Sequence, residues 1–260
     1  MKGIKVILLL FIIAIAVIPS VAASYISIQS AITSTDNKTI IKVTNLGDEA
    51  AYNVQLSLDA NGKKTASNAK RQLSVRESFE WAVPLSFKSK NPGKYPIVLT
   101  TSYEDANSYP FSAISVSTFD YKEAAVSDIA AAMGNIQLSD KGVLELKIKN
   151  TGETAKDVNV MLAVPKELTV DKDKLSVKMP AKEQKIVNFE IEKFSALAGS
   201  SYAVFAVVEY DEGGRHYTSM ANGAVKVVEK KNIFTNQALL ITLLVLLAGV
   251  FIYFQFKKKK

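Results

Sequence analysis

The sequence predicts an all-β chain with two tandem β-sandwich domains, followed by one C-terminal transmembrane helix. Two segments about 105 residues apart repeat one pattern, in which an alternating stretch ends on Asn-x-Gly. Within each copy, apolar and polar residues alternate with a period of two, which is typical of strands with one buried face. Near the C-terminus, an apolar run ends at four lysines. These three observations define the predicted domains and the predicted anchor.

Residues 1–23 have the features of a secretory signal peptide. Lys2 and Lys5 precede an apolar run over residues 6–18, and small residues follow up to Ala23. This is the order of the charged, apolar and cleavage regions of such peptides. We expect cleavage after Ala23. An uncleaved N-terminal anchor is the alternative, although thirteen apolar residues are short for a membrane span.

The two predicted domains cover residues 24–119 and 122–229. Asn and Gly recur at their turns because tight turns need residues that tolerate positive φ. We place the domain boundary at Phe119 to Tyr121. Similar separations between matching residues indicate the duplication of a whole domain. The matching pairs include Asn45 with Asn150, Gly47 with Gly152, Ala50 with Ala155 and Val54 with Val158.

The strand pattern favours an Ig-like β-sandwich in each copy. Leu144, Leu146 and Ile148 alternate with charged residues, and turn signals recur at short intervals. About seven strands per ~100 residues, without helical runs, is typical of Ig-like sandwiches. Residues 127–133 are ambiguous because three alanines favour a helix. Their place at the head of the second copy leads us to expect a first strand.

The phrase over residues 150–160, Asn-Thr-Gly-Glu-Thr-Ala-Lys-Asp-Val-Asn-Val, follows an alternating strand. With Pro180 in a later loop, a strand through Val187 and Phe189, and Gly199 before a long strand, it resembles the CARDB and NEW3 Ig-like domains of bacteria and archaea. Such modules occur in archaeal surface-layer-associated proteins and as accessory domains on glycosidases. The resemblance implies an Ig-like fold and an extracellular scaffold or adhesion role, which is an analogy at the level of the fold.

Residues 238–256 form the predicted transmembrane helix, after a juxtamembrane segment over residues 230–237. At ~1.5 Å per residue this apolar run reaches ~28 Å, close to the thickness of the hydrocarbon core. A buried core helix is the alternative. Flanking lysines favour the cytoplasmic side, so the tail at 257–260 is expected inside and the two domains outside. The tail consists of Lys257, Lys258, Lys259 and Lys260.

Charge and cysteine content exclude several classes of function. The formal charge is +7, with 32 basic and 25 acidic residues. Six of the basic residues lie at positions 2, 5 and 257–260, which leaves 26 against 25 for the rest of the chain. A nucleic-acid-binding protein needs clustered positive charge, so this class is excluded. The absence of cysteine excludes thiol nucleophiles, thiolate metal sites and disulfides.

Candidate catalytic and metal-binding residues are few. His216 is the only histidine, and we interpret it as an exposed polar residue beside a hairpin turn. Asp171 and Asp173 have the spacing of paired calcium ligands. Lys172 and Lys174 oppose a cation there, so a loop of mixed charge is favoured. No serine-hydrolase, zinc-protease or phosphate-loop motif is present, and we expect no catalytic residue, metal or cofactor.

Trp81, the single tryptophan, is expected to pack in the first domain's core rather than to stack on a sugar. Asn37 begins the only Asn-x-Ser/Thr sequon and is a possible N-glycosylation site. Acidic residues also follow two predicted strands, and we interpret them as solvated hairpin tips without partners. These are Glu104 with Asp105, and Asp211 with Glu212.

We therefore expect a non-enzymatic, single-pass cell-surface protein with an extracellular ectodomain and a cytoplasmic tail. Its domains would bind protein or glycan, in adhesion or envelope scaffolding. The alternative is an accessory subunit of a membrane complex, such as secretion, translocon or glycosylation machinery. A third hypothesis is the carbohydrate-binding part of a glycosidase. The sequence predicts neither the ligand nor the oligomeric state.

Overall fold

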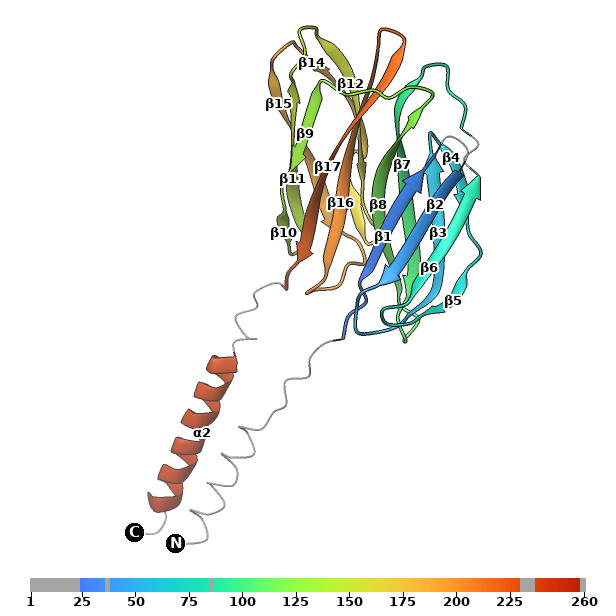
Figure 1. The fold of residues 1–260 in the computed structure, drawn as a ribbon. Coiled ribbons are helices and arrows are strands. Elements are labelled where there is room, and N and C mark those ends of the chain that lie inside the picture. Colours follow the sequence, from blue (N-terminus) through green and yellow to red (C-terminus); the bar gives the residue numbers. More distant parts are fainter. Residues whose placement is uncertain (1–23, 36–37, 85–86, 230–236, 258–260) are drawn as a thin grey trace. The chain divides into compact units, whose positions relative to one another are not determined.

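The structure, a computed structural model, describes residues 24–35, 38–84, 87–229 and 237–257 (Figure 1). These residues form seventeen β-strands and one helix, α2, which confirms the prediction of an all-β chain. The predicted signal peptide with its cleavage after Ala23, the sequon residue Asn37, and Lys258 to Lys260 lie outside the described residues. The strands of the first half are β1 (Ile28–Ser34), β2 (Lys38–Asn45), β3 (Ala51–Ala60), β4 (Lys63–Ala66), β5 (Lys70–Leu73), β6 (Ser78–Pro84), β7 (Gly93–Glu104) and β8 (Pro110–Tyr121). Those of the second half are β9 (Ile129–Met133), β10 (Ile136–Leu138), β11 (Lys141–Asn150), β12 (Lys156–Ala163), β13 (Leu168–Val170), β14 (Lys174–Met179), β15 (Gln184–Lys193), β16 (Ser201–Glu212) and β17 (Arg215–Val227).

The chain divides into two compact units. Unit 1 comprises Met1–Ser57, Ala66–Leu85 and Thr101–Phe111, and unit 2 comprises Leu58–Thr65, Ser86–Thr100 and Ser112–Lys260. The predicted domain boundary at Phe119 to Tyr121 coincides with the end of β8. The division into domains at 24–119 and 122–229 stays a prediction.

Unit 1 contains a three-stranded antiparallel sheet with the order β1-β2-β6. Ile41 at the centre of β2 lies opposite Ile32 on one side and Trp81 on the other. Burial alternates along β2 as the period of two predicts, and β3 pairs with β5. The buried apolar residues here include Ile41, Val43, Ala51, Val54, Leu56, Leu73 and Val83.

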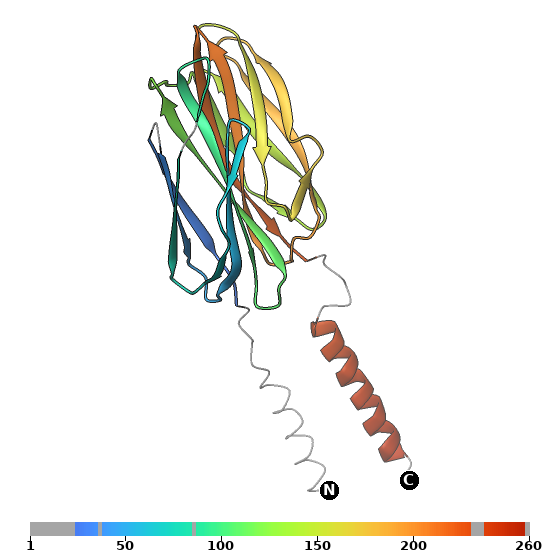
Figure 2. The same ribbon diagram turned by 90° about the vertical axis from the view of Figure 1, so that its right-hand side faces the viewer.

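Unit 2 contains a β-sandwich of the Ig-like kind. One sheet has the order β13-β15-β11-β9, and strands β14, β12, β16 and β17 are consecutive neighbours in the other. Strands β16 and β17 form an antiparallel hairpin that pairs from Ser201 with Lys226 to Glu212 with Arg215 (orange in Figure 2), and β10 runs parallel to β17. Side chains from both sheets form one core, which includes Leu144, Leu146, Ile148, Val158, Val160, Leu162, Phe189, Ile191, Val204 and Val208.

The segment over residues 127–133 forms the predicted strand. In β9, Ile129–Met133, residues pair with β11, so that Met133 lies opposite Leu146 and Ile129 opposite Asn150. The alanines of this segment favour a helix in isolation. Pairing along β11 and burial of Ile129 outweigh that preference, since strand formation depends on packing against neighbours.

Helix α2 covers Gln237–Lys257 and ends at the first of the four C-terminal lysines. Within the part of the chain that the structure describes, no helix combines the length and the apolar character needed to cross a bilayer.

Candidate functional site

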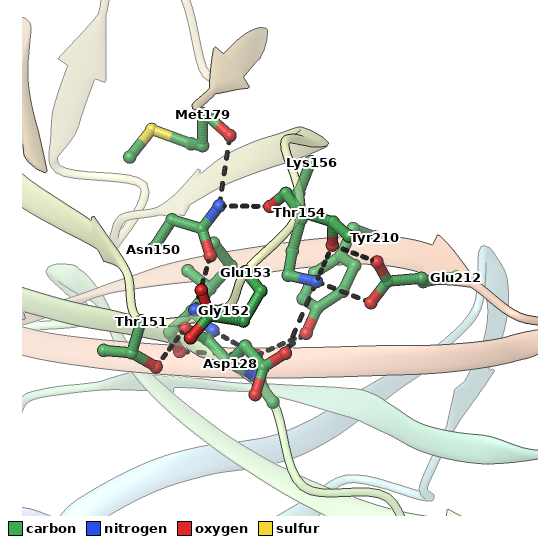
Figure 3. A network of polar contacts seen from close by, with 12 residues as sticks. Asp128, Asn150, Thr151, Gly152, Glu153, Thr154, Lys156, Met179, Tyr210 and Glu212 are labelled. Carbon is green, nitrogen blue, oxygen red and sulfur yellow. Dashed lines mark hydrogen bonds and ion pairs between the residues drawn. The ribbon is translucent and has the colours of Figure 1, made fainter. Parts of the chain in front are cut away.

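The Asn-x-Gly corner of unit 2 is built around the buried amide of Asn150 (Figure 3). Its Nδ2 group donates hydrogen bonds to three backbone carbonyls, at 2.8 Å to Thr154, 3.2 Å to Met179 and 3.0 Å to Pro180. Its Oδ1 atom accepts from the backbone N–H of Gly152 at 2.9 Å. One side chain therefore closes the turn after β11 and holds the end of β14.

Unit 1 repeats this corner with Asn45. Its Nδ2 group donates to the carbonyls of Glu49 at 2.7 Å and Leu73 at 3.2 Å, and its Oδ1 atom accepts from Gly47 N–H at 3.0 Å. A Cβ atom at Gly47 would collide with the carbonyl oxygen of Tyr25. The motif is structural in both units, because its polar groups are occupied by the backbone.

A buried lysine lies directly beside the corner of unit 2. The Lys156 side chain is 1% exposed, and its Nζ atom lies 2.5 Å from Glu212 Oε2 and 3.4 Å from Asp128 Oδ2. Nζ also lies 5.1 Å from the centre of the Tyr210 ring and donates to Thr154 Oγ1 at 3.3 Å. Figure 3 shows the ammonium group between the two carboxylates and the ring.

The Lys156 network is suited to cohesion rather than to covalent catalysis. Burial by itself lowers the pKa of Lys156, but the hydrogen bond and charge of Glu212, with Tyr210 and Asp128, outweigh burial and raise it. The hydrogen bonds of Lys156 and Thr154 lower the pKa of Glu212. An amine held in its protonated form is neither a nucleophile nor a general base. The network therefore joins β12, the end of β16 and the segment before β9 electrostatically.

The sequence contains one signal for this buried lysine. Lys156 lies on the buried face of β12, together with Val158, Val160 and Leu162. In the repeat alignment it takes the place of Ala51, which is also buried. A lysine at an inward position of a strand predicts a buried charge that needs a partner.

His216 is not exposed, and the sequence-based interpretation of this residue is wrong. Its side chain is 13% exposed, with Nδ1 at 2.9 Å from Asp211 Oδ1 and Nε2 at 3.1 Å from Glu209 Oε1. Its ring stacks on Tyr95 at 4.1 Å between centroids. The reason is the hairpin register, which sets His216 directly opposite Asp211. Glu209 then lies two residues along on the same face.

The residues around Tyr95 form a second polar cluster within unit 2. Tyr95 Oη donates to the Asn91 carbonyl at 2.7 Å, and Asn91 Nδ2 donates to Asp211 Oδ1 at 3.2 Å. The backbone N–H of His216 donates to the Pro92 carbonyl at 2.9 Å. These contacts fasten the start of β7 to the β16–β17 hairpin.

Protonation of His216 strengthens its contacts with Tyr95, Glu209 and Asp211, a group of contacts that we call the His216 clasp. Burial lowers the pKa of His216, but the hydrogen bonds and charges of Glu209 and Asp211 outweigh burial and raise it above the ordinary value of 6.5. An imidazolium between two carboxylates makes two charge-assisted hydrogen bonds. The cluster is therefore weakened when the pH rises through the raised pKa of His216 and the ring loses its proton.

The acidic turn residues have partners, so their interpretation as unpartnered hairpin tips is wrong. Glu212 binds Lys156 and Asp211 binds His216. Glu104 accepts a hydrogen bond from Asn53 Nδ2 at 2.8 Å. Asp105 accepts from backbone N–H groups in its own turn, at 2.8 Å from Asn107 and 2.9 Å from Tyr109. The partners of Glu104 and Glu212 are distant along the chain and leave no local pattern, whereas His216 lies five residues after Asp211 in the same hairpin.

The remaining candidates lie apart from these clusters. Trp81 is half-buried in β6, on the same face as the buried Val83. Asp171 and Asp173 lie in the exposed loop between β13 and β14, where Asp171 Oδ1 accepts from Glu190 N–H at 3.2 Å. Among the described residues, no group of three or more His, Cys, Asp or Glu side chains is arranged to hold a metal ion.

An open groove of about 490 Å³ lies on unit 2. Several of its polar groups already have internal partners. Asp59 accepts from Gly62 N–H at 2.8 Å, Asn159 accepts from Ser176 Oγ at 2.7 Å, and Glu209 contacts His216. The lining includes Asp59, Pro96, Asn159, Met161, Lys174 and Glu209.

Comparison with known proteins gives low structural similarity. No protein-family model matches the chain, and no curated protein sequence matches it. Trypsin-activated α2-macroglobulin from Escherichia coli is similar at 10% identity and a TM-score of 0.31, over 78% of this chain and 18% of that one. The seventh ScaB type I cohesin from Pseudobacteroides cellulosolvens is similar at 9% identity and a TM-score of 0.27, over 41% of this chain and 96% of that one. The chain thus spans less than a fifth of the macroglobulin's length, and similarities this low carry no inference about activity or partners.

Proposed function

We propose that the protein is a non-enzymatic, single-pass surface protein that holds two tandem Ig-like domains outside the cell. The domains bind protein or glycan in adhesion or in an envelope scaffold of the surface-layer-associated kind. Residues 238–256 are the membrane anchor, and Lys257 to Lys260 lie in the cytoplasm. The observation that carries the proposal is the apolar C-terminal helix that follows the β domains.

The membrane part of the proposal rests on the sequence and on the exposure of helix α2. The described apolar side chains near its centre are each more than half exposed: Ile241, Leu243, Leu244, Val245, Leu246, Leu247 and Val250. Burial of such a side chain is favourable by ~1.5–3 kcal/mol, so these seven, already partly covered, supply roughly 10 kcal/mol for entry into lipid. Lysines directly after an apolar span favour the cytoplasmic side.

The binding part of the proposal is supported by how the polar groups of the two units are used. Lys156, His216 and both corner asparagines are engaged by neighbouring groups of the fold, so their chemistry stabilises the domains. What the fold presents outward is sheet edges and loops. In unit 1, β1 and β6 are the outer strands of a three-stranded sheet, and such strands can pair with an extended segment of a partner.

The location is tested with the full chain expressed in cells. We expect it in the membrane fraction after alkaline extraction. Protease added outside should remove residues 24–232 and spare a tag placed after Lys260. A matched control, Leu244→Lys with Leu247→Lys, should release the same domains into the soluble fraction. Wild-type protein in the soluble fraction, or a tag digested from outside, would refute the proposal.

The partner is tested by crosslinking in native membranes followed by mass spectrometry. Surface-layer or other envelope proteins are the expected products. Translocon, secretion or glycosyltransferase subunits recovered in fixed ratio would instead identify the chain as an accessory subunit of such a complex. Specific signals on a glycan array, without protein crosslinks, would favour a carbohydrate-binding module.

A further inference from the structure

One loop of unit 2 presents apolar side chains to solvent although its backbone is held in place. The loop runs over residues 194–200, between β15 and β16. Phe194 is 75% exposed and Leu197 is 42% exposed, whereas Ala196 between them is buried. The N–H groups of Phe194 and Ser195 both donate to the carbonyl of Glu167, at 3.0 and 3.1 Å. The outward position of the two apolar side chains is therefore fixed by the fold.

This loop lies at the end of the sandwich from which the chain leaves for helix α2. Gly199 N–H donates to the Val227 carbonyl at 2.9 Å, and Val227 N–H donates to the Ser200 carbonyl at 2.9 Å. Val227 is the last residue of β17. Residues 228–236 then separate Val227 from Gln237, where helix α2 begins, and ten extended Cα–Cα steps span at most ~36 Å. Val227, which the loop contacts, therefore lies within that distance of the start of the helix.

The charges near the loop suit a lipid surface. Lys193 directly precedes Phe194, Lys226 lies opposite Ser201, and the sequence continues after β17 with Glu229 and then two lysines. Lys193 lies 3.9 Å from Asp140, so part of this charge is balanced. No acidic residue occurs from Phe194 to Ser201. Lysines beside aromatic and aliphatic side chains are typical of the headgroup region, where the apolar parts enter and the amines stay with phosphates.

From these observations we infer that the loop over residues 194–200 is a membrane-contacting loop that inserts Phe194 and Leu197 into the headgroup boundary of the bilayer. The inference rests on the proposed function, because the bilayer is the one in which helix α2 is anchored. The contact fixes unit 2 close to the membrane.

The test uses the full chain with Trp81→Phe, which leaves a background free of tryptophan. Phe194→Trp is compared with Val126→Trp after incorporation into vesicles of phosphatidylcholine and phosphatidylglycerol. Val126 is 88% exposed. Its neighbour Ser127 contacts the Tyr210 hydroxyl at 3.4 Å, close to the end of β16 that lies farthest from Ser201. The two positions therefore report on opposite ends of the same sandwich.

Brominated lipid should quench Trp at 194 several-fold more than Trp at 126, and the emission at 194 should shift to the blue. A second probe, Leu197→Trp, should behave like the one at 194. Equal and weak quenching at 194 and 126 in protein that floats with the vesicles would overturn the membrane contact while the anchor stands. Protein that does not float with the vesicles would instead overturn the proposed function. Shielding of Trp at 194 that appears only after envelope proteins are added would assign the loop to a protein partner and also overturn the inference.

Discussion

Replacement of the buried Lys156 should lower the free energy of unfolding less than replacement of its partner carboxylate, Glu212. In Glu212→Gln, the Lys156 ammonium stays 1% exposed and loses the charge 2.5 Å away, while Asp128 remains at 3.4 Å. Breaking a fully buried pair from one side costs about 3–5 kcal/mol. Because Glu212 is 39% exposed, the cost is reduced by solvent screening, and we expect about 2 kcal/mol of lost unfolding free energy.

Lys156→Met should change the free energy of unfolding by less than about 1 kcal/mol, because an apolar side chain of similar length replaces a desolvated charge. Glu212 keeps its hydrogen bond from Thr154 Oγ1 at 2.6 Å and reaches water. The double variant should match Lys156→Met alone, which gives a coupling of about 2 kcal/mol.

Urea denaturation of the detergent-solubilised full chain measures these differences. Tyrosine circular dichroism is a suitable signal, because the rings of Tyr210 and Tyr217 stack at 4.9 Å in unit 2. A Lys156→Met variant that is less stable than Glu212→Gln would refute the reasoning, since the lysine would then contribute more than its own desolvation removes.

Three further predictions concern Asn150, the His216 clasp and Gly93. Asn150→Ala should destabilise unit 2 by about 2–4 kcal/mol, since buried carbonyls lose their donor. Asn150→Asp should cost at least as much, because it sets an acceptor oxygen against the same buried carbonyls; an Asp variant as stable in urea as wild type would contradict this. The pKa of His216 is raised on folding, so its contribution is fully present below pH 6.5 and is lost as pH rises through the folded value. Melting temperature should therefore fall with rising pH above 6.5, and His216→Phe, which keeps a ring to stack on Tyr95, should flatten this slope; an unchanged slope would refute the clasp. Gly93→Ala should cost more than about 3 kcal/mol, because its φ is 138° and a Cβ atom would collide with the His216 carbonyl oxygen. If hydrogen exchange of the β17 amides near His216 were as slow in Gly93→Ala as in wild type, this prediction would be contradicted.

Sequence predicted those parts of the fold whose determinants are local. The corners at Asn45 and Asn150 are complete within a few residues of chain plus one neighbouring strand, so a short motif reports them. The alternation in β11 likewise predicted its buried face, because a strand's periodicity is a property of the strand itself.

Most contacts of the two clusters could not be predicted because the residues that make them are distant along the chain. Lys156 and Glu212 are 56 residues apart. Tyr95 contacts His216 because a parallel β-bridge pairs His216 with Gly93, and no turn signal or residue spacing in the sequence predicts this bridge. The place of Lys156 on the buried face of β12 is a local signal, but it indicates only a buried charge and not which residue pairs with it.

The buried amides of Asn45 and Asn150 also stabilise the register of the strands in which they lie. If β11 slipped by one residue, Lys149 or Thr151 would take the place of Asn150, and neither side chain offers an amide's two donors and acceptor in one plane. Buried carbonyls left unpaired cost ~1–3 kcal/mol each, and the same slip would turn the apolar face of β11 toward water. Asn45 and Asn150 therefore each favour the native alignment of the strand that ends on them.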